Sequence, residues 1–249
     1  VAEVLAHGKG KKIIVCEAGR YHKWFGYTAS TMNILEGKGM TFSKEGNWIF
    51  SAKTAGGGSV VYGGLAFKPP AWLKEKYGID LEPEVAEIYE EVPIRPLPET
   101  HIGPGALKIL EAARDLGLDW KPNDRFIRTD RCKPDCGRCM HGCKEGAKWT
   151  AREYLEEGVR QGSRLLLRTR VDRVLTKSGR AVGVRARGPG GPIDILADTV
   201  IVSAGGLGTP PILQRSGLYD AGRGFVVDFG RFVCGPCETQ PSRYEIPAA

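Results

Sequence analysis

Four cysteines lie close together in the run CKPDCGRCMHGC: Cys132, Cys136, Cys139 and Cys143. Thiolates at such short separations can converge on one metal centre. All-cysteine ligation suits an iron–sulfur cluster of the 4Fe-4S or 3Fe-4S type, and it suits a structural zinc ion equally well. The spacing alone does not separate a cluster, a zinc ion and free or disulfide-bonded thiols. The sequence therefore predicts these four side chains as candidate metal ligands.

The other cysteines leave further alternatives open. Cys234 and Cys237 form a C-x-x-C pair, which could act as redox thiols or add ligands to a metal. Clustered spacing without a secretory signal favours metal or redox use over a disulfide framework. His141 lies inside the four-cysteine run, and we expect it to be a solvated neighbour because four cysteines already complete a site.

Composition and charge limit the classes of function. The chain has 249 residues, which is enough for one large or two small domains, and it is rich in glycine with 34 residues. Its net charge is +7, but the basic residues are spread out and interleaved with acids, which favours a solvated surface over nucleic-acid binding. No apolar run approaches the roughly 18–20 residues of a membrane span. We expect a cytoplasmic protein without a membrane span.

The elements that must position these residues include both helices and strands. Helices are expected over residues 1–7, 80–91, 106–116 and 145–161, and a strand over residues 12–16. Between residues 165 and 204, three or four β-branched runs are separated by SGR and GPGGP turns, which predicts consecutive strands. The last of these runs, TVIVSAGG, is expected to be a buried strand. Thr209 is expected to cap the helix that follows it, with proline in the first turn.

Three motifs indicate a nucleotide cofactor. Glu17 follows the strand KIIVC, where an acidic residue can accept hydrogen bonds from ribose hydroxyls, although an ordinary strand-end glutamate fits equally. The run GGGSVVYGG, beginning at Gly56, would let backbone N–H groups approach a pyrophosphate or a flavin edge, and it could also be a flexible surface loop. Residues 202–218 predict a strand–turn–helix of the dinucleotide-binding type.

Taken together, these motifs resemble the glucose–methanol–choline (GMC) family of FAD-dependent oxidoreductases over nearly the whole chain. The second signature of that family is matched by Gly205, Thr209, Pro210, Leu213, Ser216 and Gly217. The resemblance implies an α/β fold with a discontinuous Rossmann-like FAD-binding domain (residues 1–65 and 165–218). It also implies an inserted helix-rich segment with the cysteine cluster (residues 66–164) and the start of a substrate domain (residues 219–249).

The resemblance also implies the residues that would contact FAD. These are Glu17, Ala18, Gly19, Gly57, Gly58, Ser59, Gly63, Val171, Ala204, Gly205 and Thr209. The family carries a GxGxxG loop upstream of the position of Val1 and a catalytic histidine beyond the position of Ala249. The four histidines of this chain match none of the family's catalytic positions, so the chain resembles a central fragment and its catalytic residues are left unassigned.

The function implied is an FAD-dependent dehydrogenase that oxidises an alcohol (CH–OH) to a carbonyl and needs the missing segments or a partner chain for activity. One branch of the family has cysteines just before a Gly-Ala-Lys segment, as in CKEGAK here, and its sugar dehydrogenases hold a three-iron cluster there. Electrons would then leave through an iron–sulfur cluster to a protein or quinone acceptor, with other subunits of a complex as partners. The alternatives are a non-catalytic electron-transfer or structural subunit and a flavoenzyme with a structural zinc. A zinc-bearing nucleic-acid binder would not explain residues 202–218.

Overall fold

The computed structural model describes residues 1–8, 10–23, 26–39, 41–134, 136–224 and 238. The chain forms two compact units, which are described separately. Unit 1 comprises Val1–Tyr21 and Tyr154–Gly235, and unit 2 comprises His22–Glu153 and Pro236–Ala249. The boundary falls in the first turn of helix α6 (Arg152–Arg160). The α/β class is confirmed, whereas the domain bounds given above stay a prediction.

Unit 1 begins with the expected helix and strand. Helix α1 (Ala2–Ala6) is followed by strand β1 (Ile14–Cys16). Strand β1 pairs in parallel with β7 (Arg164–Leu166), in a register that joins Ile14 to Arg164. Parallel partners need a long crossover connection, and here the chain between the two strands contains most of unit 2.

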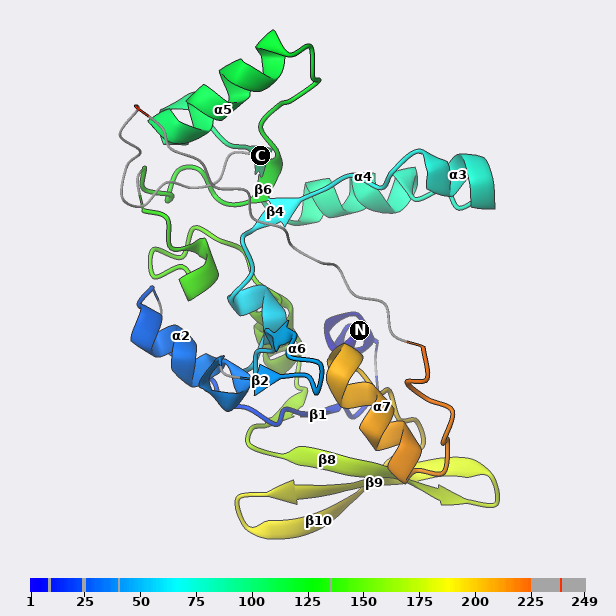
Figure 1. Ribbon diagram of the computed structural model, residues 1–249. Helices are drawn as coiled ribbons and strands as arrows, with labels where there is room; N and C mark the ends of the chain where they lie inside the picture. Colours follow the sequence, from blue (N-terminus) through cyan, green and yellow to red (C-terminus); the bar gives the residue numbers. More distant parts are fainter. Residues whose placement is uncertain (9, 24–25, 40, 135, 225–237, 239–249) are drawn as a thin grey trace. The chain divides into compact units, whose positions relative to one another are not determined.

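A three-stranded antiparallel meander contains the other strands among the described residues of unit 1 (Figure 1). Its strands are β8 (Arg170–Lys177), β9 (Arg180–Gly188) and β10 (Gly191–Leu196). The predicted SGR turn lies between β8 and β9, where Ser178 and Gly179 have φ of +48° and +76°. Helix α7 (Gly205–Arg215) packs on β8, and the Ser216 hydroxyl accepts a hydrogen bond from the Val174 N–H at 2.8 Å.

Two expectations for the end of this unit are wrong. Residues 199–204 are not a strand, and Ile201 is 53% exposed. An apolar run becomes a strand only if a neighbouring backbone satisfies its N–H and C=O groups, and no strand among the described residues pairs with it. Thr209 is not an N-cap, because α7 begins four residues earlier, at Gly205. Its two prolines therefore lie inside the helix instead of in its first turn.

Unit 2 consists of short elements joined by loops. Its first part contains α2 (Thr28–Ile34), η1 (Glu36–Gly39), β2 (Thr41–Phe42), β3 (Trp48–Ile49), η2 (Gly57–Val60) and β4 (Leu65–Ala66). Its second part contains α3 (Trp72–Tyr77), α4 (Glu82–Glu91), β5 (Ile94–Pro96), η3 (Glu99–His101), α5 (Pro104–Asp115), β6 (Asp124–Phe126) and η4 (Cys139–His141). Strands β2 and β3 form a hairpin, and a second antiparallel sheet has the order β4-β6-β5.

The helices of unit 2 follow the sequence patterns in part. Helices α4 and α5 lie close to their predicted ranges, whereas α3 was not predicted. The helix expected from residue 145 begins only at Arg152. The preceding backbone is engaged elsewhere, since the Trp149 N–H donates to the Phe126 carbonyl at 2.9 Å and the Arg128 N–H to the Ala147 carbonyl at 2.8 Å.

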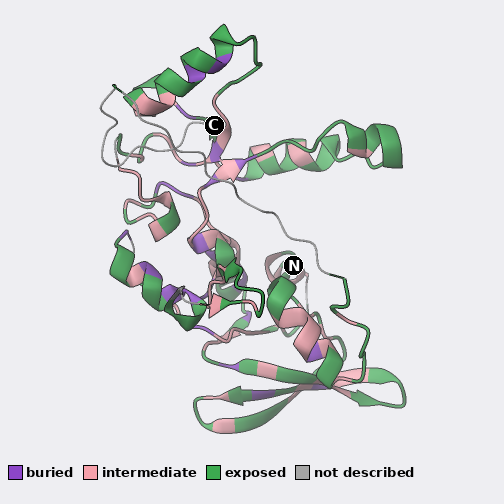
Figure 2. Ribbon diagram, viewed as in Figure 1, coloured by how far each residue is buried: buried purple, intermediate pink, exposed green. Residues whose placement is uncertain are grey.

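Burial in unit 2 is concentrated around its loops and sheet. Helices α3 and α4 are exposed along most of their length (Figure 2), whereas Ile34, Ala55, Val60, Ile94 and Ile127 are almost fully buried. The interior also holds three basic side chains, Arg125, Lys148 and Arg152, which are 1%, 4% and 5% exposed. Buried charges are costly unless they are paired or hydrogen-bonded, so the surroundings of these cations bear on the site.

Candidate functional site

The predicted ribose-binding segment, residues 17–19, lies directly after β1 in unit 1. The Glu17 carboxylate accepts a hydrogen bond from the Gly19 N–H at 2.5 Å, which fixes its orientation at the strand end. The Glu17 carbonyl accepts from the Thr169 N–H at 2.8 Å, and the Gly19 carbonyl accepts from the Arg168 N–H at 2.8 Å. These bonds place residues 17–19 beside Arg168 and Thr169, which lead into β8. The predicted contact Val171 follows Thr169 by two residues, within β8.

Ala204, Gly205 and Thr209 are placed at the N-terminal end of α7. Ala204 is the N-cap residue, and Gly205 has a positive φ of +76°, a conformation that favours glycine. Ala204 and Gly205 are exposed, and a Cβ added to Gly205 would meet no atom within 4 Å. The backbone at this helix start is therefore open to approach.

The glycine segment, residues 56–64, contains the other predicted cofactor contacts and belongs to unit 2. Gly57, Gly58 and Ser59 lie in η2, and Gly63 lies just before β4. A Cβ added to Gly57 or Gly58 would meet no atom within 4 Å. Gly56 differs, because its Cβ would lie 2.6 Å from Cγ of Arg152. One side of the segment is thus packed against protein, and the other presents bare backbone.

The cysteine loop, residues 132–143, surrounds a cavity of about 20 Å³ in unit 2. All four predicted ligands, Cys132, Cys136, Cys139 and Cys143, line it, together with Ile127, Lys133, Arg138, Glu145, Ala147 and Lys148. All four are free and half-buried. The four thiols therefore line one cavity, which has room for about one water-sized group, and their role as metal ligands stays a prediction.

The ligand geometry of a metal centre is nevertheless not formed. Within the described ranges, no group of three or more cysteine, histidine or carboxylate side chains is arranged to hold a metal ion. His141, inside the run, has Nδ1 at 3.0 Å from the Thr31 hydroxyl. Cys234 and Cys237 lie outside the described residues.

The surroundings of Cys132 and Cys139 favour the neutral thiol, because both pKa values are raised. Burial raises the pKa of Cys132 to about 11, and the neighbouring cysteines contribute in the same direction. Burial also raises the pKa of Cys139, although the charges of Lys148 and Arg125 oppose this shift. Burial lowers the pKa of Lys148 to about 8. Buried cations thus lie near Cys132 and Cys139, but they do not offset the cost of ionising these two thiols.

Arg125 has an incompletely satisfied guanidinium. It donates from Nη1 to the Gly63 carbonyl at 3.2 Å, but its buried Nε and Nη2 have no hydrogen-bond partner among the described residues. Sequence reasoning missed this residue, because an arginine in the short strand DRF gives no local sign of burial. Its burial follows from its central position in the sheet β4-β6-β5.

Arg152 and Ser59 fix the packed side of the glycine segment. Arg152 donates from Nε to the Ala55 carbonyl at 2.7 Å and from Nη2 to the Thr54 hydroxyl at 2.9 Å. The Ser59 hydroxyl donates to the Gly56 carbonyl at 2.5 Å and accepts from the Ala151 N–H at 3.0 Å. The start of α6 therefore holds the glycine segment in two ways: the Arg152 side chain binds the two residues just before it, and the Ala151 N–H binds the Ser59 hydroxyl within it.

Sequence comparisons relate this chain to one family. Residues 31–227 match the family model described as GMC oxidoreductase. An uncharacterized GMC-type oxidoreductase of Mycobacterium tuberculosis is 34% identical over 178 residues, which cover 67% of this chain and 28% of the relative. The long-chain-alcohol oxidase FAO4B of Arabidopsis thaliana is 27% identical over 84% of this chain and 31% of its own length.

Solved structures show the same fold. Pyridoxine 4-oxidase from Mesorbium loti superposes with a TM-score of 0.65 at 19% identity, over 91% of this chain and 52% of that chain. An FAD-dependent oxidoreductase from Chaetomium thermophilum gives a TM-score of 0.54 at 17% identity, over 87% of this chain and 45% of that chain. The chain thus spans about a third of its curated relatives and about half of these structures.

Among the helices of the described residues, none has the length and apolar character needed to cross a bilayer.

Proposed function

Because the chain belongs to the GMC oxidoreductase family, we propose that it is part of an FAD-dependent enzyme that oxidises an alcohol (CH–OH) to a carbonyl. The name of one relative, a long-chain-alcohol oxidase, supports an alcohol as the class of substrate. The chain spans only part of its relatives, so further protein segments would complete the substrate pocket and supply the catalytic base. When bound, FAD supplies the two-electron oxidant.

Each of the two units contains residues that suit part of a dinucleotide. Glu17 follows a strand of a parallel pair and is held in place by the Gly19 N–H, so its carboxylate could accept hydrogen bonds from ribose hydroxyls. Gly57 and Gly58 leave the space beside their backbone empty, which would allow a planar ring to approach without a clash. The observation that carries the proposal is the open space beside the backbone of Gly57 and Gly58, in a segment whose opposite side packs against Ala151 and Arg152.

The test is FAD binding to the purified protein, followed by quenching of flavin fluorescence. Gly58→Ala adds one methyl group where no protein atom lies within 4 Å, so folding should be unaffected while the approach of FAD is blocked. We expect its affinity for FAD to fall at least tenfold, by about 1.4 kcal/mol or more. Glu17→Gln should also weaken binding, because a neutral amide is a poorer acceptor for hydroxyl groups.

Gly190→Ala is the matched control, since a Cβ there also meets no atom within 4 Å and the residue lies in a turn of the meander. It should bind FAD as the unaltered protein does. Failure of the unaltered protein to bind FAD would overturn the cofactor proposal. Equal affinity in Gly58→Ala and Gly190→Ala would remove the glycine segment from the site.

A second candidate is an enzyme whose electrons leave through a metal centre in the cysteine loop. The observation that favours it is the convergence of four cysteines on one cavity. The described thiols do not form a ligand set, and about 20 Å³ is closer to a single ion than to an iron–sulfur cluster. Iron and acid-labile sulfide in the purified protein would support a cluster, and zinc alone would support a structural site. Absence of all three would leave a metal-free flavoenzyme.

A further inference from the structure

Lys148 connects the glycine segment to the cysteine loop. Its ammonium group donates to the carbonyls of Val60 and Tyr62 at 3.0 and 2.7 Å, and to the carbonyl of Cys139 at 2.6 Å. The side chain is 4% exposed. Three N–H donors thus meet three backbone acceptors from two separate loops.

The surroundings of Lys148 reinforce this arrangement. Its ammonium lies 4.7 Å from the centroid of the Tyr62 ring, within range of a cation–π interaction. The Tyr62 hydroxyl donates to the carbonyl of Trp149 at 3.1 Å. A Cβ added to Gly64 would lie 3.4 Å from Cδ of Lys148, so the lysine stem also packs beside the segment.

A buried ammonium is an expensive way to fill an interior site. Removing its charge from water is unfavourable, and an apolar side chain of similar length would avoid that cost. What the lysine adds is a defined position for both loops, because its ammonium group binds the carbonyls of Val60 and Tyr62 in one loop and of Cys139 in the other. Because both loops bind the same ammonium group, a movement of one loop relative to the other would break some of the three hydrogen bonds of Lys148.

We propose that Lys148 is a positioning residue for the cofactor. It holds the backbone of the glycine segment in the position in which FAD can approach it, and it links that position to the position of the cysteine loop. This inference rests on the proposed binding of FAD at residues 57–63. Lys148 itself does not touch the cofactor in this scheme. It acts through the carbonyls of Val60 and Tyr62, while Arg152 and Ser59 hold the earlier part of the segment.

The test compares Lys148→Met with Lys144→Met. Lys144 is an exposed lysine on the same stretch of chain, with its ammonium 3.7 Å from Glu145. We expect Lys148→Met to bind FAD at least tenfold more weakly and to change the visible circular dichroism of the flavin that is still bound. Lys144→Met should match the unaltered protein in both measurements. Lys148→Arg, which keeps a charged donor, should recover part of the affinity.

A folded Lys148→Met variant with unchanged affinity and an unchanged flavin spectrum would overturn the inference while leaving the cofactor proposal intact. If the unaltered protein binds no FAD, both fail together. Should Lys148→Met not fold, hydrogen exchange on the unaltered protein decides. FAD should slow exchange at residues 57–64 and also at residues 139–149, and protection confined to residues 57–64 would contradict the link.

Discussion

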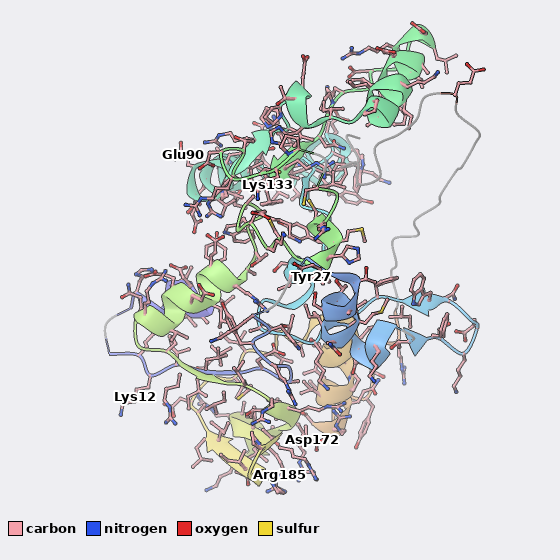
Figure 3. All side chains as sticks on the ribbon, turned by 90° about the vertical axis from the view of Figure 1, so that its left-hand side faces the viewer. Lys12, Tyr27, Glu90, Lys133, Asp172 and Arg185 are labelled. Atoms are coloured by element: carbon pink, nitrogen blue, oxygen red, sulfur yellow. The ribbon has the colours of Figure 1, made fainter. Side chains whose placement is uncertain are left out.

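Arg170 and Arg187 are direct cross-strand partners in the antiparallel pair β8–β9, so two guanidinium groups project from the same face of the meander. A register shift after Val171 places Arg173 opposite Arg185. Arg185 and Arg187 are two residues apart on one strand, so all four arginines share that face. Figure 3 shows Arg185 on the meander, where it pairs with the carboxylate of Asp194 at 2.7 Å.

Replacing one member of the Arg170–Arg187 pair with glutamate should stabilise the protein. Like charges directly opposite each other repel, and Arg187→Glu converts that repulsion into attraction. We expect the free energy of unfolding to rise by about 0.5 kcal/mol at low salt. Chemical denaturation measures the change, with Arg187→Gln as an intermediate case. The gain should shrink in 1 M salt, and a gain that survives high salt would show that charge is not its cause.

The Arg185–Asp194 pair gives a pH-dependent prediction. Hydrogen bonds from Arg185 hold the pKa of Asp194 below its ordinary value. A carboxyl whose pKa is lower in the folded state stabilises fully above its unfolded pKa, and this stabilisation is lost as the pH falls through the folded pKa. In Arg185→Gln, the pKa of Asp194 should return toward the ordinary value, as followed by NMR titration of its carboxyl carbon. An unchanged pKa would mean that the bonds do not persist in solution.

Gly183 should tolerate no side chain. Its φ is +148°, and an added Cβ would lie 2.9 Å from Cα of Leu196 on the neighbouring strand β10. Gly183→Ala would therefore push β9 and β10 apart, and we expect a loss of roughly 2–4 kcal/mol in the free energy of unfolding. Gly190→Ala, in the turn between the same strands, should change stability little. Similar losses in both variants would contradict the steric argument.

Gly56 should be required for a different reason from Gly58. Its φ of +88° and the contact of its Cβ with Arg152 Cγ make alanine strained at this position. Gly56→Ala should lower the free energy of unfolding by roughly 1–3 kcal/mol and weaken FAD binding as a consequence. Gly58→Ala should weaken FAD binding without loss of stability. Thermal denaturation without FAD separates the two, and a stable Gly56→Ala would refute the packed geometry.

The sequence predicted those elements whose signals are local. The meander β8–β9–β10 was predictable because β-branched runs alternate with SGR and GPGGP turns, and α5 because its apolar residues recur at helical spacing. Residues 199–204 have the same strand-like composition, but composition cannot reveal whether a partner strand is present. Helix α3 is short, and its six residues give too little periodicity to detect.

The candidate site was predictable only where its motifs are contiguous. The four cysteines could be assigned to one place because they lie within one loop. Lys148 and Arg152 could not be identified, because their acceptors other than Cys139 lie 86 to 130 residues earlier in the chain. No local pattern distinguishes a buried lysine that bonds distant carbonyls from a solvated one.

The parallel pairing of β1 with β7 also bears on the synthesis of the protein. Ile14 can pair with Arg164 only after Arg164 has left the ribosome, which is about 150 residues later in synthesis. At about 5–20 residues per second, this delay is roughly 8–30 seconds. During that time β1 lacks β7, the strand that pairs with it among the described residues, while most of unit 2 emerges from the ribosome. A nascent chain of this kind depends on early folding of unit 2, or on chaperones, to keep its first strand from pairing with the wrong partner.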